Sequence, residues 1–258
     1  MEKLFNIGRV FYGIAIIGMG LQAIYYRRFP YILQLPEHFS KPAGMVLALV
    51  FGLVFTVGGV SVFFEKIARP ISLLFGAVLL LIFCFYYIPY ELLVSPNYMH
   101  FPDWENAEKE LAFAGGAFFI AGCFSVKKED QPFTFLAKLI PLGAVLFAIP
   151  VISFGILHFM LAKEAASYIP AWIPFHLFWM YFCGAALIGS GVSIIFKIKT
   201  GLFAMLLGIM IFIWFAVLHI PRIIAAPAAD IAGELSSAFF ALGYSGIAFA
   251  IAGGKKAN

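Results

Sequence analysis

Three histidines and one arginine lie beside long apolar runs in the second half of the sequence. They are His158 in FGILHF, His176 in PFHL, and His219 and Arg222 in HIPR. Imidazole and guanidinium groups donate hydrogen bonds, and imidazole can also transfer a proton or bind a metal ion. Two of the histidines could be axial haem ligands, and all three could bind zinc, but no sequential motif supports either site. We therefore expect neither haem nor a metal ion.

The first half adds a phenol and a pair of opposite charges. Tyr87 stands in YIPYE, and Lys109 and Glu110 stand in WENAEKEL. A quinone ring requires a flat aromatic slot, donors for its two carbonyls, and an acid or imidazole to handle protons. The groups that could provide these functions are His158, His219, Arg222, Tyr87 and Glu110. Because the chain has no C-x-x-C-H, cysteine cluster or nucleotide fingerprint, a partner subunit would have to bring the electrons.

Each candidate also has a purely structural explanation. Arg222 could reach a lipid headgroup phosphate, and His219 could bond a carbonyl left free by the proline that follows it. His176 follows a proline and precedes a tryptophan, which is typical of a helix start in an interfacial aromatic belt. Lys109 and Glu110 could belong to a solvated first helical turn. Residue type and spacing leave both explanations open.

The composition places these residues in a membrane protein. The chain has 258 residues, of which 63% are hydrophobic and 12% charged, and its mean hydropathy is +0.99. A soluble domain is nearer half apolar and a quarter charged. The basic residues stand singly or in pairs between apolar runs, which excludes a nucleic-acid footprint. The three cysteines form no C-x-x-C, so we expect no disulfide framework.

Charged residues, prolines and glycine clusters divide the chain into eight apolar segments. They run roughly over 8–26, 42–64, 70–90, 107–124, 139–161, 174–196, 200–221 and 233–253. A helix needs about 20 apolar residues to span a bilayer, and none of the segments alternates like a strand. The sequence therefore predicts an all-α membrane protein with eight transmembrane helices. Eleven of the 17 Lys and Arg residues fall on the side of the two termini, which places both termini in the cytoplasm.

The two halves of the chain are related. GGAFFIAG (115–122) and GIAFAIAG (246–253) share six residues of eight, and a separation of 132 aligns Ile88-Pro89 with Ile220-Pro221. We predict two four-helix repeats, at 1–130 and 131–258. An even number of spans per repeat makes the repeats parallel, which favours a ligand cleft between two bundles. The sequence shows no clear pair of broken helices; Pro150 is the only proline in the middle of a span.

These residues suggest a family. Each half resembles the four-helix unit of the DoxX-like membrane proteins, through GRVFYGIAIIG and WENAEKELAFAGGA in the first half. In the second half the resemblance rests on FGILHF, YIPAWIPFHLFW, GSGVSIIFKIK and HIPR. It implies an integral protein of the bacterial inner membrane, in a family with some members that are membrane subunits of quinone-linked oxidoreductases.

Three classes of function follow. The first is a quinone-interacting subunit of a membrane oxidoreductase, which would work with a soluble or membrane redox partner. The second is a non-catalytic partner or assembly protein of another membrane complex. The third is a transporter that carries a small molecule through the cleft between the repeats. In each class the protein is at most the membrane subunit of an enzyme.

Overall fold

The computed structural model describes residues 2–29, 41–95, 99–124 and 133–254, and every regular element among them is helical. The first half contains α1 (Glu2–Tyr26), α2 (Lys41–Ser61), α3 (Glu65–Ile82), the π-helix η2 (Phe83–Tyr87), α4 (Ile88–Leu93), the 3-10 helix η3 (Phe101–Trp104) and α5 (Glu105–Gly122). The second half contains the 3-10 helix η5 (Leu136–Leu142), α6 (Gly143–Met160), α7 (Ala162–Ala165), the 3-10 helix η6 (Ala166–Tyr168), α8 (His176–Ile195), α9 (Thr200–Trp214), the π-helix η7 (Phe215–His219), α10 (Ile220–Ala225) and α11 (Ile231–Gly253). The all-α prediction is confirmed.

Seven helical stretches in the described part of the chain are long and apolar enough to cross a membrane. They are α1, α2, α3 through α4, η5 with α6, α8, α9 through α10, and α11. The predicted fourth span is the helix α5. It has 18 residues, but its first two turns contain Glu105, Glu108, Lys109 and Glu110. The apolar helices therefore identify the chain as a multi-pass membrane protein. One helix that packs among them, α5, carries several charges near its start.

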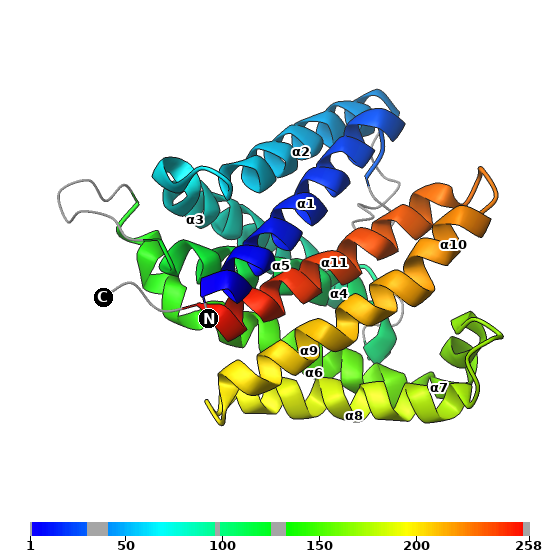
Figure 1. The fold of residues 1–258 in the computed structure, drawn as a ribbon. Helices are drawn as coiled ribbons and strands as arrows, with labels where there is room; N and C mark the ends of the chain where they lie inside the picture. Colours follow the sequence, from blue (N-terminus) through cyan, green and yellow to red (C-terminus); the bar gives the residue numbers. More distant parts are fainter. Residues whose placement is uncertain (1, 30–40, 96–98, 125–132, 255–258) are drawn as a thin grey trace.

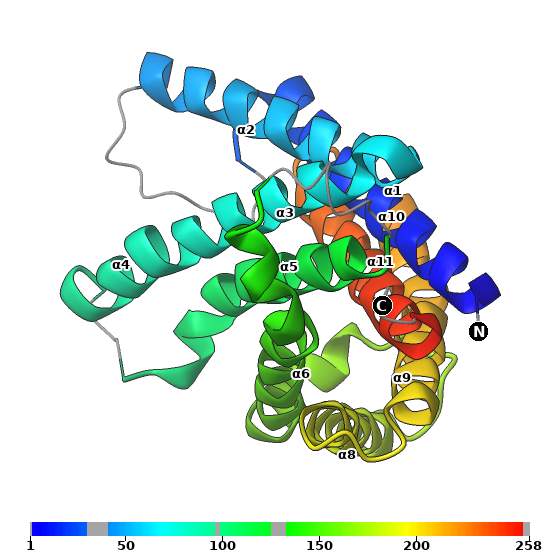
Figure 2. The same cartoon turned by 90° about the vertical axis from the view of Figure 1, so that its left-hand side faces the viewer.

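Successive long helices run in alternating directions, as the two views together show (Figures 1 and 2). The described N- and C-terminal ends lie near each other, where α1 begins and α11 ends (Figure 1). We call the opposite end, where α1 and α10 end and α5, α8 and α11 begin, the distal end.

The helices pack in corresponding pairs. In the first half α1 packs on α2, and α3 on α5; in the second half α6 packs on α8, and α9 on α11. The halves meet where α1 packs on α11, where α5 packs on α6, and where α5 contacts α11. Most residues of α5 and α11 are buried, so these two helices form the centre of the molecule.

Glycines permit the closest contacts between the halves. A Cβ on Gly246 would lie 2.7 Å from the carbonyl oxygen of Gly8, and a Cβ on Gly115 would lie 2.6 Å from the carbonyl oxygen of Gly143. The backbones of α1 and α11, and of α5 and α6, therefore touch without intervening side chains, as small residues allow in membrane helices.

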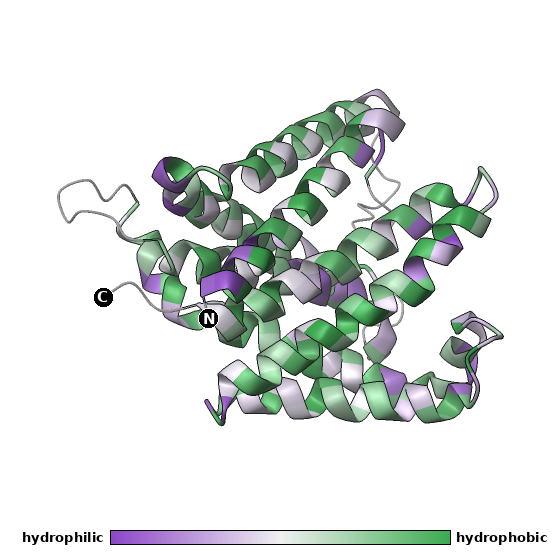
Figure 3. Ribbon diagram, viewed as in Figure 1, coloured by the Kyte–Doolittle hydropathy of each residue, from purple (hydrophilic) through white to green (hydrophobic). Residues whose placement is uncertain are grey.

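The outward faces of the long helices are apolar. Large hydrophobic side chains such as Val50, Leu53 and Val57 on α2 and Ile213 on α9 are exposed. Hydrophobic colouring covers most of the ribbon (Figure 3). A surface of this kind suits a lipid bilayer, because the hydrocarbon solvates it without a free-energy penalty.

The third and seventh spans are each continuous, and each contains one π-helical turn. The Ile88 N–H donates to the Phe83 carbonyl, and the Ile220 N–H donates to the Phe215 carbonyl, five residues back in each case. A proline follows each donor. A proline ring has no N–H and clashes with the carbonyl four residues earlier. A wider helical turn before the proline moves that carbonyl away and removes the clash. Pro150 lies within α6, a regular α-helix.

Candidate functional site

Two adjoining cavities lie at the distal end. The inner cavity, of about 580 Å³, is half-open and is lined by α6 and the segment that follows it, by α8, α9, η7 and α11, and by the start of α5 at one side. The outer cavity, of about 620 Å³, lies between the end of α1 and the segment from η7 to the start of α11. Both are lined by Tyr168, Leu218, His219 and Ser237. We call these four residues, which border both cavities, the neck.

The inner cavity has an aromatic wall. Besides Tyr168 of the neck, the aromatic side chains that line it are Phe154, Trp179, Trp214, Phe240 and Tyr244. Trp179 and Trp214 pack edge to face with centroids 6.1 Å apart, and Trp214 Nε1 donates to Cys183 Sγ at 3.0 Å. This wall offers flat apolar surfaces on several sides, which suits an aromatic or polyunsaturated ligand.

One cation stands at the side of this cavity. Lys109 Nζ lies 2.6 Å from Glu105 Oε1 and donates to Asn106 Oδ1 at 3.3 Å. It also lies 5.8 Å from the ring centroid of Phe154 and 5.7 Å from that of Phe240. The ammonium group is thus held by a carboxylate and by two ring faces at the edge of an apolar space, and it can only donate hydrogen bonds.

His158 faces the same cavity from the end of α6. Its Nδ1 lies 2.7 Å from the carbonyl oxygen of Phe154, one turn earlier. Because a carbonyl only accepts, Nδ1 carries the hydrogen in this contact. The other ring nitrogen, Nε2, is then the one available to a ligand.

Two polar atoms near the cavity have no hydrogen-bond partner among the described residues. Tyr244 Oη lies in the interior on α11, and His219 Nδ1 lies in η7. A buried polar atom without a partner costs free energy, so such an atom requires an explanation. Both residues line the inner cavity, but these two atoms have almost no accessible surface, so a ligand would contact them only after a side-chain rotation.

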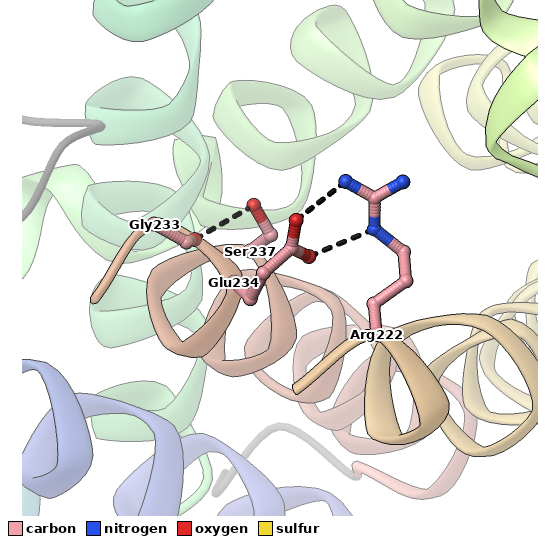
Figure 4. Close-up of polar contacts among 4 residues, drawn as sticks. All are labelled: Arg222, Gly233, Glu234 and Ser237. Carbon is pink, nitrogen blue, oxygen red and sulfur yellow. Dashed lines mark hydrogen bonds and ion pairs between the residues drawn. The ribbon is translucent and has the colours of Figure 1, made fainter. Parts of the chain in front are cut away.

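Arg222 and Glu234 close one side of the outer cavity. Arg222 Nε donates to Glu234 Oε2 at 2.8 Å and Nη2 donates to Glu234 Oε1 at 2.5 Å, a two-pronged pair between α10 and α11 (Figure 4). Ser237, one turn further along α11, donates to the Gly233 carbonyl. The guanidinium carbon lies 4.6 Å from the ring centroid of Tyr168. The pair and the ring together hold Arg222 beside the neck.

The structure brings together only some of the residues that the sequence singles out. His158, His219 and Lys109 line the inner cavity, and His219 and Arg222 line the outer one. Tyr87 and Glu110 are buried elsewhere, in the packing of the first half and α5, and line neither cavity. His176 is the first residue of α8 and also lines neither.

The three histidines of the second half therefore do not converge. No group of three or more His, Cys, Asp or Glu side chains within the described ranges is arranged to hold a metal ion. The inner cavity itself is built from helices of the second half, with only Glu105 and Lys109 coming from the first, according to the residues that the structure describes.

Several lining residues carry weaker sequence signals. They are Gln22, Glu105, Trp214, Glu234 and Tyr244. Gln22 and Tyr244 stand inside apolar spans, where a polar side chain is expensive, and this signal could have identified them. Glu234 could not have been assigned to Arg222, because the two residues belong to different spans.

The arrangement can bind a flat, largely apolar molecule with hydrogen-bond acceptors at its rim. Lys109 is an obligate donor, Tyr244 Oη can donate, and aromatic rings provide most of the remaining contact area. No protein-family model matches this chain, and no curated protein or solved structure matches it either.

Proposed function

We propose that this protein binds a quinone in the inner cavity and is a membrane subunit of a quinone-linked oxidoreductase. The observation that carries the proposal is the aromatic wall of the inner cavity with the Lys109 ammonium at its side, 5.8 and 5.7 Å from the ring centroids of Phe154 and Phe240. A quinone carries two carbonyl acceptors on a flat ring, and its ring would stack on Trp179 and Trp214. Lys109 would stabilise the negative charge that develops on the carbonyl oxygen during reduction.

The electrons would come from another subunit. The chain has no sequence motif for a bound electron carrier, so its own part is to bind the ring, exclude water from it and orient it. His158 Nε2, at the rim of the cavity, would exchange protons with the ring. A partner docked at the membrane surface would deliver the electrons.

We further propose that α5 also crosses the membrane and that the eight crossings form two related units, 1–130 and 131–258. The corresponding helix pairs support this arrangement, as do the π-helices 83–87 and 215–219, which are 132 residues apart. Such a layout fits the DoxX-like resemblance. With more Lys and Arg on the side of the termini, both termini would be cytoplasmic in a bacterial inner membrane.

The test is quinone binding by the purified protein. Protein prepared in mild detergent is titrated with decylbenzoquinone while tryptophan fluorescence is followed. Trp179 and Trp214 line the inner cavity, whereas Trp172 is 69% exposed and lines neither cavity. We expect quenching that persists in Trp172→Phe and is largely lost in the double variant Trp179→Phe with Trp214→Phe.

Tyr244→Phe removes one of the donors at the cavity and keeps the ring, so we expect quinone affinity to fall about tenfold, the effect of one buried hydrogen bond. Tyr181→Phe is the matched control, because Tyr181 stacks on Phe159 and lies outside both cavities. No quenching, together with no quinone in lipid extracts of the purified protein, would contradict the proposal and favour the partner or assembly role.

A further inference from the structure

The outer cavity carries charges of both signs. Four charged side chains line it: Arg28 just after α1, Arg222 on α10, Asp230 just before α11, and Glu234 in the first turn of α11. Arg222 and Glu234 neutralise each other through their two hydrogen bonds (Figure 4). Arg28 and Asp230 are exposed, and neither forms an ion pair with another described residue. The cavity therefore has one uncompensated cation and one uncompensated anion.

An aromatic ring holds Arg28 at the α1 side of the cavity. The guanidinium carbon lies 5.5 Å from the ring centroid of Tyr26, which also lines the cavity. Packing over a ring does not use the five N–H donors of the group, and a planar guanidinium can bond two oxygens of one phosphate. The α1 side of the cavity therefore suits an anionic group.

The α11 side of the cavity offers acceptors. The Asp230 side chain makes no capping hydrogen bond to the helix that begins after it. The Ser237 hydroxyl donates to the Gly233 carbonyl at 3.1 Å, which leaves its oxygen to accept. A Cβ added to Gly233 would meet nothing within 4 Å, so the space beside this turn is open. This side suits an ammonium group, which has donors only.

A buried amide joins these two sides. Gln22 on α1 is 6% exposed, and its Nε2 donates to the Ala232 carbonyl at 2.6 Å and to Ser236 Oγ at 2.8 Å, both on α11. Its oxygen, Oε1, is buried, has no hydrogen-bond partner among the described residues and takes no part in the site. The amide therefore acts through position, because it holds α1 against α11 next to the cavity.

The cavity lies at the depth of lipid headgroups. It is at the distal end of the spans, where α11 lies between α1 and α10 (Figure 1). The two flanking helices expose apolar side chains next to the cavity, Leu21 on α1 and Ile220 on α10. A lipid can therefore keep its acyl chains on these side chains, in the bilayer, while its headgroup enters the cavity.

We propose that the outer cavity binds the headgroup of a zwitterionic phospholipid of the phosphatidylethanolamine class. Arg28 binds the phosphate, Asp230 and the Ser237 oxygen accept hydrogen bonds from the ammonium group, and the acyl chains lie along α1 and α10. A zwitterion compensates both free charges at once, whereas an anionic headgroup leaves Asp230 without a cation and beside a like charge. This inference does not rest on the proposed function, because the ligand of the inner cavity takes no part in it.

The experiment compares lipids that share their acyl chains and differ in headgroup charge. Native mass spectrometry of the delipidated protein in detergent measures the binding of dioleoyl phosphatidylethanolamine, dioleoyl phosphatidylglycerol and N-acetylated dioleoyl phosphatidylethanolamine. The last two keep the phosphate and have no ammonium group. We expect each of them to bind at least about threefold more weakly, the ratio for one exposed ion pair. Equal binding of the three lipids would overturn the proposal without requiring any variant.

Two variants assign the charges of the headgroup to their partners. Arg28→Gln should weaken both phosphatidylethanolamine and phosphatidylglycerol about threefold, whereas Asp230→Asn should weaken phosphatidylethanolamine about threefold and leave phosphatidylglycerol no weaker. Arg27→Gln is the matched control, because Arg27 is the exposed neighbour of Arg28 and does not line the cavity. If Asp230→Asn had the same effect on both lipids, the ammonium group would not be bound by Asp230 and the proposal would be wrong.

Free phosphoethanolamine distinguishes a lipid from a soluble ligand with the same charges. It has no acyl chains, so we expect it to displace phosphatidylethanolamine only at concentrations at least about a hundredfold higher. Displacement at equal concentrations would show that the ligand is a soluble zwitterion and that the assignment to a lipid is wrong. Tryptophan quenching by decylbenzoquinone in the same preparation tests the inner cavity separately, so the failure of either proposal is visible without the other.

Discussion

Arg222 illustrates how a single residue gains its role from a partner on another helix. Its position at the end of an apolar run is compatible with a side chain that reaches for lipid phosphate. In the structure its guanidinium group is instead bound by both oxygens of Glu234 and packs over Tyr168. His219, three residues earlier, keeps an unpartnered Nδ1 between the two cavities. The two neighbouring side chains therefore differ: a carboxylate binds Arg222, whereas His219 Nδ1 has no partner among the described residues.

The first residue-scale prediction concerns this pair. Lysine keeps the charge of Arg222 but cannot form two parallel bonds with one carboxylate. We expect Arg222→Lys to lower the free energy of unfolding by about 1 kcal/mol, the upper end for a partly exposed pair. Thermal or chemical unfolding in detergent measures the change.

A double-mutant cycle with Glu234→Gln tests whether the loss comes from the pair. In the Glu234→Gln background, where the carboxylate is absent, Arg222→Lys should lower the free energy of unfolding by markedly less. Arg28→Lys, on the same cavity, is the control, because among the described residues its guanidinium group packs over the ring of Tyr26. Equal costs in the presence and absence of the Glu234 carboxylate would show that the two residues are not coupled.

At the scale of elements, the prolines of the third and seventh spans explain the π-helices. Pro89 and Pro221 follow the residues whose N–H groups reach five positions back. Only the second of these π-helices lines a cavity: Leu218 and His219 of η7 form part of the neck, whereas η2 contributes Tyr87 to the core. A π-helix before a proline thus contributes to core packing in the first half and lines the candidate site in the second half.

The second prediction concerns the helix contact between the halves. A Cβ on Gly115 would meet backbone atoms of α6 at 2.6 and 2.7 Å, which no rotamer change can relieve. We expect Gly115→Ala to lower the free energy of unfolding by about 1–3 kcal/mol, because the helices must separate to admit the methyl group. The midpoint of thermal unfolding in detergent is the measurement.

Gly189 on α8 provides the matched control, because a Cβ there meets nothing within 4 Å. Gly189→Ala should be neutral or slightly stabilising, since alanine favours the helix. If both substitutions had the same effect, the close contact of α5 with α6 would not contribute to stability.

At the scale of the whole molecule, α5 is the unusual element. It packs on α3 and α6 and contacts α11, and most of its residues are buried although it begins with four charged side chains within six residues. Lys109 and Glu105 form an ion pair at the side of the inner cavity, while Glu110 is 2% exposed on the side of the first half. Glu110 is thus covered by neighbouring helices, whereas the Glu105 side chain is 39% exposed.

The third prediction follows from the number of crossings. If α5 crosses the bilayer with the seven apolar stretches, the total is even, so reporters fused before α1 and after α11 should both be on the cytoplasmic side. Fusions to an enzyme active only in the periplasm and to a fluorescent protein that folds only in the cytoplasm measure this. Termini on opposite sides would exclude a crossing by α5 and with it the two-repeat arrangement.

The sequence by itself determined the helices. Hydropathy and the positions of prolines and glycines are local properties, and they decide where a segment is apolar and long enough to cross a bilayer as a helix. The expected segments agree with the long helices to within a few residues at most ends, and the match between Pro89 and Pro221 reappears as two matched π-helices. The candidates His158, His219, Lys109 and Arg222 were recognisable for the same reason: polar side chains at the ends of apolar runs are costly and therefore conspicuous.

Only the tertiary structure decided which of these residues share a site. Glu234 and Arg222 are 12 residues apart on separate helices, and Gln22 meets Ser236 across 214 residues. Contacts of this kind depend on helix rotation and crossing angle, which side-chain packing over the whole bundle sets and no local pattern encodes. For that reason Tyr87, Glu110 and His176, equally plausible by residue type, lie outside the cavities, whereas Tyr244 and Gln22, inconspicuous in their apolar spans, present the unpartnered atoms.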